Sequence, residues 1–290
     1  MNIKPKPTWL RKKLPSGPEF GEVSSLLAEQ GLHTVCREAR CPNQGECFSR
    51  RTATFMIMGS RCTRNCRFCA VDHGPKMLPD PNEAKRVALA AKELGLNYVV
   101  VTSVTRDDLP DGGAGCFAAV IRELRAEIEG VKVEVLVPDF QGDPAALAAV
   151  VRASPQVLNH NLETVPRLYP QARPQADYGR SLELLARAGQ LDGRMHTKSG
   201  LMLGLGETKA EIKKALADLL EAGCTVLTLG QYLQPSQNHL PVARYLPPDE
   251  FDSLRETALA MGFAHVVSGP FVRSSYKAEA LFDQKAPDAC

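Results

Sequence analysis

The sequence lacks the features that mark membrane-spanning and secreted proteins. No run approaches the ~18 consecutive apolar residues that a transmembrane helix needs, and no apolar segment follows the basic residues near the N-terminus, as it would in a signal peptide. A strong charge of one sign is also missing, because 35 basic residues oppose 33 acidic ones and leave a net charge of +2. We therefore expect a cytoplasmic protein without a membrane partner.

The cysteines do not have the pattern of a disulfide framework. There are nine of them, an odd number, and no secretory signal accompanies them. With 290 residues, of which 44% are hydrophobic, the chain can bury a core without disulfides or metals. Six of the nine cysteines lie between Cys36 and Cys69, so we expect this cluster to serve a metal or redox centre.

The N-terminal arm is locally basic. A contact with nucleic acid or with an acidic protein is one interpretation of such an arm, but a solvated, partly extended tail is the favoured one, and we predict no nucleic-acid partner. The basic residues of the arm are Lys4, Lys6, Arg11, Lys12 and Lys13.

Six short apolar or β-branched runs alternate with helical patterns after Thr52. Such runs are typical of parallel strands that are buried on both faces, and they occupy residues 54–58, 98–104, 132–138, 157–162, 196–205 and 226–233. For the helices, Asn82 predicts one N-cap, Gly95 a helix end, and Thr208 with Glu211 a capping box. Weaker helical patterns cover residues 115–128, 144–152, 177–188 and 249–261.

Consecutive strand–helix units predict a parallel sheet with right-handed crossovers. Polar residues follow nearly every predicted strand, at Cys62 and at residues 102–108, 139–141, 159–163, 204–207 and 231–237. A barrel gathers such strand ends around one mouth. We therefore predict an α/β fold with a partial barrel of six units, a Cys-rich N-terminal extension and a short C-terminal tail.

Two cysteine triplets carry the chemistry. The first, CREARCPNQGEC, holds Cys36, Cys41 and Cys47, and the second, CTRNCRFC, holds Cys62, Cys66 and Cys69. Zinc usually takes four ligands in pairs, whereas each iron of a four-iron cluster needs one protein ligand. A triplet of cysteines would supply a ligand to three of the irons and leave the fourth iron with an open coordination position. The spacing thus favours iron–sulfur clusters over zinc.

These motifs resemble those of a known family. The spacing C-x3-C-x2-C, with Phe68 before its last cysteine, is similar to that of radical S-adenosylmethionine (SAM) enzymes, in which SAM binds the open iron. The upstream triplet and RSSY at 273–276 resemble the lipoyl synthase family. The resemblance extends over VTSVTRDDLPDGGA, NHNLETV, GLMLGLGE and YLQPSQNHLPV, and runs from about residue 5 to about residue 280.

The resemblance implies roles for particular residues. Cys36, Cys41, Cys47 and Ser274 would hold an auxiliary 4Fe–4S cluster, and Cys62, Cys66 and Cys69 the cluster that binds SAM. Weaker expectations place the SAM contacts at Phe68, Asn161, Glu163, Gly204 and Gly206. It also implies three segments, namely residues 1–51 with the auxiliary-cluster ligands, the radical SAM partial barrel of 52–272, and the RSSY tail of 273–290.

The implied reaction is insertion of two sulfurs, at C6 and C8, into an octanoyl chain on a lysine of a lipoyl carrier domain. The implied carriers are the E2 subunits of 2-oxoacid dehydrogenases and the glycine cleavage H protein, and the implied electron donor is flavodoxin or ferredoxin. Three alternatives stand beside it: another sulfur-inserting radical SAM enzyme similar to biotin synthase, a ferredoxin-like electron carrier, and a zinc-dependent nucleic-acid binder. Arg106, Asp107 and Asp108 fit either SAM contacts or loop caps and ion pairs.

Overall fold

A curved sheet forms the body of the protein. The computed structural model describes residues 5–12, 17–74 and 77–282, so Lys4 and Lys13 of the basic arm and the last eight residues of the tail lie outside the described residues. The strands of the sheet, in spatial order, are β1 (His33–Thr34), β2 (Thr54–Ile57), β5 (Tyr98–Ser103), β6 (Lys132–Leu136), β7 (Val157–Asn159), β8 (His196–Leu203), β9 (Val226–Gln231) and β10 (His265–Gly269).

All six predicted strands are present in the sheet. From β2 to β10 each strand pairs in parallel with its neighbour, and β10 adds a seventh parallel strand where the sequence predicted only a final apolar run. The two-residue strand β1 pairs antiparallel with β2. Within the described residues no pairing joins β1 to β10, so the barrel is open between them.

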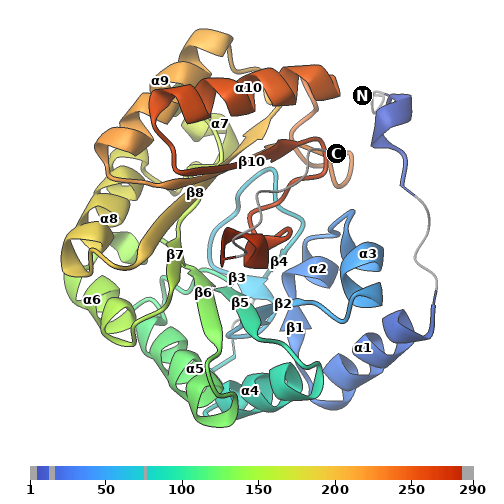
Figure 1. Cartoon of the computed structure of the whole chain (residues 1–290), viewed down its shortest axis with the longest axis vertical. Helices are drawn as coiled ribbons and strands as arrows, with labels where there is room; N and C mark the ends of the chain where they lie inside the picture. Colours follow the sequence, from blue (N-terminus) through green and yellow to red (C-terminus); the bar gives the residue numbers. More distant parts are fainter. Residues whose placement is uncertain (1–4, 13–16, 75–76, 283–290) are drawn as a thin grey trace.

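The larger helices cover the convex face of this sheet (Figure 1). They are α4 (Glu83–Glu93), α5 (Ala114–Glu127), α6 (Pro144–Arg152), α8 (Tyr178–Leu191), α9 (Lys209–Glu221) and α10 (Pro248–Met261). The remaining elements are α1 (Pro18–Glu29), α2 (Val35–Glu38), α3 (Gln44–Ser49), α7 (Tyr169–Ala172), the 3-10 helices η1 (Thr8–Leu10), η2 (Phe140–Gly142), η3 (Pro166–Leu168) and η4 (Ala278–Phe282), and a second small sheet of β3 (Arg61–Cys62) and β4 (Asp72–His73). Among the described residues, no helix is long and apolar enough to cross a membrane.

The local signals explain where the helices begin. The predicted capping box is formed, because the Thr208 side chain accepts from the N–H of Glu211 and the Glu211 carboxylate accepts from the N–H of Thr208. At α4 the boundary is as predicted but the cap is different. Asn82 makes no side-chain cap bond there, and its own N–H donates to Asp80.

The two faces of the sheet are buried in different ways. The outer face packs apolar residues such as Val99 and Val133 against the helices. The inner face carries a buried ion pair, in which Lys198 Nζ on β8 lies 2.8 Å from Glu134 Oε1 on β6, and the Tyr98 hydroxyl donates to Glu134 at 2.7 Å. Because a buried charge is stable only with partners, this network keeps a polar interior between the strands.

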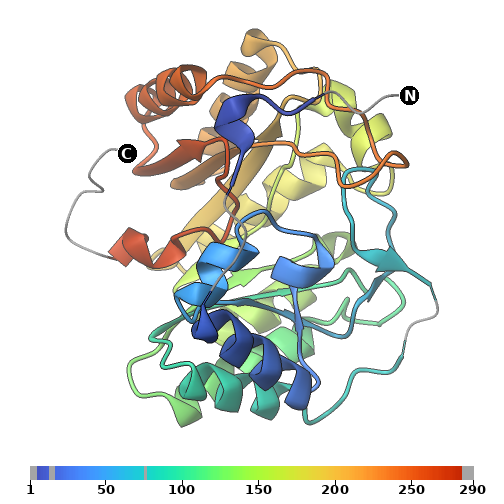
Figure 2. The same ribbon diagram turned by 90° about the vertical axis from the view of Figure 1, so that its right-hand side faces the viewer.

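The ends of the chain fill the open side of the barrel. In both views η4 lies beside the N-terminal helices α2 and α3, although about 230 residues separate them along the chain (Figures 1 and 2). The hydroxyl of Tyr276 donates to Glu46 at 2.8 Å, and the amide of Asn43 donates to the carbonyl of Phe271 at 2.7 Å. The N-terminal extension and the C-terminal tail therefore meet at the mouth.

Candidate active site

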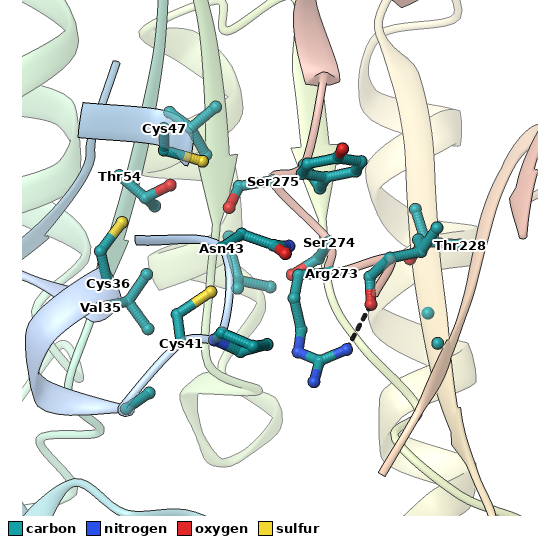
Figure 3. A pocket seen from close by; sticks show the side chains of 18 of the residues that line it. Val35, Cys36, Cys41, Asn43, Cys47, Thr54, Thr228, Arg273, Ser274 and Ser275 are labelled. Carbon is teal, nitrogen blue, oxygen red and sulfur yellow. Dashed lines mark hydrogen bonds between the residues drawn. The ribbon is translucent and has the colours of Figure 1, made fainter. Parts of the chain in front are cut away.

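A cavity of about 280 Å³ lies where the barrel interior meets the two chain ends. Its lining comes from the N-terminal segment, from strands β2, β5, β6, β8 and β9, from the loops after β2 and β7, and from the segment that contains RSSY. Figure 3 shows Cys36, Cys41 and Cys47 on one side and Ser274 and Ser275 facing them. Residues from the two ends of the chain thus share one cavity.

The first triplet is shaped by two short helices. Cys36 lies on α2, whose N-cap Thr34 accepts from the N–H of Arg37, and Cys47 lies on α3. The N–H of Cys41 donates to the carbonyl of Cys36 at 3.1 Å, which turns the chain back toward the first thiol. Burial, with smaller contributions from the nearby Cys41 and Cys47, raises the pKa of Cys36 to about 12. The three thiols are therefore electrostatic neighbours.

The segment that carries Ser274 approaches the sheet closely at Gly230. A Cβ added to Gly230 would lie 2.2 Å from the carbonyl oxygen of Val272, so any side chain there would displace the segment. From the opposite side, the amide of Asn161 donates to the Ser274 hydroxyl at 3.4 Å. Ser274 is thereby held between the strand ends and the first triplet.

The second triplet lies in the loop that follows β2. Cys62 ends β3, and the N–H of Cys69 donates to the carbonyl of Cys66 at 3.0 Å, so the last two cysteines share one turn. Burial raises the pKa of Cys66 to about 11 and that of Cys69 to about 12. Phe68 and Cys69 line the cavity, so this loop and the first triplet face a common space.

An ion-pair network fixes the second loop. Arg64, between Cys62 and Cys66, donates to Asp107 at 2.7 Å and to Asp139 at 2.6 Å, and only 4% of its side chain is exposed. Burial alone would raise the pKa of Asp139, but the hydrogen bond and charge of Arg64 outweigh it and lower that pKa to about 2. Asp107 is thus an ion-pair partner.

Two residues of the loop that follows β5 pair with each other. Arg106 donates to Asp108 from two nitrogens, both at 2.8 Å. Of the two interpretations that the sequence left open for this stretch, ion pairing is therefore the one that the side chains adopt.

Asn161 and Glu163 extend from the end of β7 into the cavity. Glu163 has a φ of 67°, a left-handed conformation that is uncommon for a residue with a side chain and that is often found at functional sites. The Asn161 amide donates to Glu163 at 3.1 Å, while its buried Oδ1 has no hydrogen-bond partner among the described residues. Burial raises the pKa of Glu163. This pair forms a polar subsite between the triplets.

The two predicted glycines occupy a different position. Gly204 and Gly206 follow β8 but are not part of the cavity lining, and a Cβ on Gly204 would meet Gln231 Nε2 at 2.3 Å and the carbonyl of Arg244 at 2.4 Å. Glu207 accepts from the N–H of Gly204. The close approach at Gly204 is therefore to the protein itself, and a SAM contact at these glycines stays a prediction.

Two arginines of the site were missed by sequence reasoning. Arg173 is buried beside Cys66 and Glu163, and its Nε has no hydrogen-bond partner among the described residues. Arg273, the first residue of RSSY, lies near Cys41 and Glu163, and burial lowers the pKa of its guanidinium. Arg273 was recognised only as part of RSSY, and the positions of both arginines in the site depend on residues far away along the chain.

The donor set fits iron–sulfur clusters. Within the described part of the chain, no group of three His, Cys, Asp or Glu residues lies close enough to hold a single metal ion. A four-iron cluster has another requirement, since each cysteine binds a separate iron. The first triplet and Cys69 of the second line one cavity, and two triplets of thiols meet that requirement. Asn161 also lines this cavity, and its Oδ1 has no hydrogen-bond partner among the described residues.

Comparison with known proteins defines the class. The family model of the radical SAM superfamily matches residues 56–219. Solved structures with the same fold include SuiB of Streptococcus suis bound to S-adenosylmethionine, with a TM-score of 0.60 and 11% identity over 78% of this chain and 54% of that chain. Another is methylornithine synthase, with a TM-score of 0.52 and 16% identity over 78% of this chain and 67% of that one. The chain spans about half the length of SuiB. It is a radical SAM protein.

Closer relatives define the family. A lipoyl synthase of Desulfotalea psychrophila is 58% identical over 277 residues, which are 96% of this chain and 93% of that protein. A lipoyl synthase of Rubrobacter xylanophilus is 56% identical over 94% of this chain and 85% of that protein. The chain belongs to the lipoyl synthase family, whose cofactors are SAM and two 4Fe–4S clusters.

Proposed function

We propose that this chain inserts two sulfur atoms, at C6 and C8, into an octanoyl chain that is amide-linked to a lysine of a lipoyl carrier domain. The observation that supports the proposal is that the first triplet, which Figure 3 shows, and Cys69 of the second triplet line the same cavity. The target carbons are unactivated, so side-chain acids, bases and nucleophiles cannot attack them, and such chemistry falls to cofactors that the protein positions and shields. A biotin synthase-like enzyme is not favoured, because the sequence has both the upstream triplet and RSSY.

The residues divide between two roles. We assign Cys62, Cys66 and Cys69 to the cluster whose open iron binds SAM. The first triplet, with Ser274 as the fourth ligand, is assigned to the auxiliary cluster. When bound, the SAM cluster together with SAM supplies the radical chemistry, and the auxiliary cluster supplies the sulfur. The chain's own part is to hold the two centres on one cavity and to exclude water between them.

The SAM subsite is proposed around the end of β7. Asn161 and Glu163 offer an amide and a buried carboxyl to the ribose hydroxyls, and the free Asn161 oxygen supports this role. Arg173 offers its unpartnered Nε to the SAM carboxylate, and Phe68 contributes apolar surface. Arginine suits a carboxylate because its planar donors match the two oxygens.

The partners and the location follow from the reaction. We propose the E2 subunits of 2-oxoacid dehydrogenases and the glycine cleavage H protein as carriers, and flavodoxin or ferredoxin as the electron donor. A cytoplasmic location suits a centre built on free thiols, because such compartments keep them reduced. The proposed division of labour assigns residues 1–51 and 273–290 to the auxiliary centre and 52–272 to the SAM barrel.

Iron and sulfide counting after anaerobic reconstitution tests this function. We expect about eight irons per chain, because two 4Fe–4S clusters contain that number. A chain that takes up about four irons, or that binds zinc and has no visible absorbance, would contradict the two-cluster assignment. The activity to measure is then the transfer of sulfur to a folded, octanoylated carrier domain. The comparison substrate is an unfolded peptide that contains the same octanoylated lysine.

A further inference from the structure

Lys12 of the basic arm is part of the site rather than of a solvated tail. Its ammonium donates to Asn43 Oδ1 at 2.6 Å and to Glu46 Oε2 at 2.8 Å, and 25% of its side chain is exposed. The same ammonium lies 4.7 Å from the centre of the Phe271 ring and 5.6 Å from that of Tyr276, within the range of cation–π attraction. One lysine therefore contacts both the segment of the first triplet and the segment of RSSY.

Direct bonds between those two segments complete the arrangement. The Asn43 amide donates to the carbonyl of Phe271 at 2.7 Å, and the Tyr276 hydroxyl donates to Glu46 Oε1 at 2.8 Å. Asn43 lies two residues after Cys41, and Glu46 directly precedes Cys47. The anchors on the other side, Phe271 and Tyr276, enclose Ser274 and Ser275 along the chain.

We propose that Lys12, Glu46 and Tyr276 form a clasp that positions the serine segment against the first cysteine triplet and so determines how firmly that site retains its cluster. These three are positioning residues, because none of them touches the reacting atoms. The inference rests on the proposed function, in which Ser274 is the fourth ligand of the auxiliary cluster.

The physical reason lies in the weakness of the serine ligand. A hydroxyl oxygen is a harder and poorer partner for an iron–sulfur centre than a thiolate. Such a ligand competes with water only when the protein keeps it at a high effective concentration near the iron. The clasp does this by tying the segment on both sides of Ser274, because Lys12 lies against the Phe271 ring and Glu46 accepts from the Tyr276 hydroxyl.

The test measures how fast each cluster loses iron. The full chain, loaded anaerobically with both clusters, is mixed with an excess of an iron chelator, and the coloured chelate is followed with time. Tyr276→Phe removes only the hydroxyl that reaches Glu46. Tyr178→Phe is the matched control, because its hydroxyl donates to Asp218 at 2.9 Å on the outer helices, away from either triplet.

We expect half of the iron to leave roughly tenfold faster in Tyr276→Phe than in Tyr178→Phe, because a hydrogen bond to a charged group stabilises by at least that order. The other half should leave at the rate of the unchanged chain. Mössbauer spectra recorded during the reaction would show which of the two clusters loses the iron that leaves faster. Equal rates in Tyr276→Phe and the control would overturn the clasp, and so would faster loss of both halves together.

A second variant distinguishes the loss of the clasp from a general disturbance of the fold as the cause of faster iron loss. Glu46→Gln keeps an acceptor for Tyr276 but removes the charge that pairs with Lys12. If the clasp acts as a unit, the double variant Glu46→Gln/Tyr276→Phe should lose iron hardly faster than the faster single variant. Effects that multiply would contradict it. An unchanged chain that holds only about four irons would instead contradict the two-cluster assignment itself.

Discussion

The two cysteine triplets are held by different parts of the molecule. The second is fixed by the barrel: Arg64 pairs with Asp107 and Asp139 at the ends of β5 and β6, and the N–H of Arg67 donates to the carbonyl of Ala172 at 2.8 Å. His239, from the loop after β9, contacts the carbonyl of Cys69 at 2.9 Å. Its supports thus come from four separate strand ends of the body.

The first triplet depends on the chain ends instead. Its two helices, α2 and α3, have four and six residues, and their outer contacts are with Lys12, Phe271 and Tyr276. Proteins open locally at little cost near their termini, whereas core elements open only with global unfolding. We therefore expect the first site to open more readily than the second, which suits a cluster that is taken apart as a sulfur donor.

Cysteine substitutions should separate the two sites most strongly. Cys69→Ala removes a ligand of the SAM cluster and should abolish SAM cleavage. Cys41→Ala should leave cleavage in place and abolish sulfur insertion, because its loss affects only the auxiliary centre. Both products are measured in a single anaerobic assay, by chromatography for cleaved SAM and by mass spectrometry for the carrier.

Cys224→Ala is the control for this pair. Cys224 is buried on the outer side of the barrel, where its thiol contacts the carbonyl of Val226, so it should retain both activities. If Cys69→Ala and Cys41→Ala lost cleavage to the same degree while each kept its remaining cluster, the two sites would not have separate roles.

Breaking the network around Arg64 should have the next largest effect. Arg64→Met leaves the buried Asp139 with Arg180, at 3.4 Å, as its remaining ion-pair partner among the described residues. Removing one member of a buried ion pair costs about 3–5 kcal/mol of unfolding free energy. We expect loss of the second cluster with retention of the first, measured by iron counting and by thermal unfolding. Arg167→Met is the comparison, because its pair with Glu211 is exposed and should contribute little.

The ion pair between Arg64 and Asp139 also predicts how the free energy of unfolding changes with pH. The pKa of Asp139 lies at about 2 in the folded chain, below its ordinary value of 3.8. A carboxylate with a lowered pKa contributes stability that is complete above the unfolded value and is lost as pH falls through the folded value. Stability should therefore fall between about pH 4 and pH 2, and Asp139→Asn should flatten the curve there. An unchanged slope would show that Arg64 does not pair with Asp139 in solution.

Much of the fold could be predicted from local patterns. Six strands have apolar or β-branched runs long enough to recognise, and the capping box at Thr208 is a four-residue signal that the structure confirms. The short strand β1 could not be found, because two residues have no periodicity.

Some residues of the site could likewise be predicted from the sequence, and others could not. The cysteines were recognisable because their spacing is local, and RSSY because it matches a family motif. Lys12, Arg64 and Arg173 were missed, since each acts on partners more than ten residues away, and 31 residues separate Lys12 from Asn43. A basic arm looks solvated when its acidic and aromatic partners cannot be placed, which is why the sequence did not predict the contacts of Lys12 with Glu46 and Phe271.

The smallest predicted effect concerns His239, at the edge of the second loop. Because the Cys69 carbonyl can only accept, Nε2 carries the proton and donates at 2.9 Å, and Nδ1 accepts from the Ser236 hydroxyl at 2.8 Å. His239→Leu removes this bond and should cost about 1 kcal/mol, or roughly a fivefold faster loss of iron from the second cluster. His239→Gln can still donate a hydrogen bond, so its rate of iron loss from the second cluster should lie between those of His239→Leu and the unchanged chain. Neither variant should change the rate of iron loss from the first cluster. If the chelator assay found the first cluster accelerated instead, the two triplets would share their supports, and the contrast between a fixed and an openable site would fail.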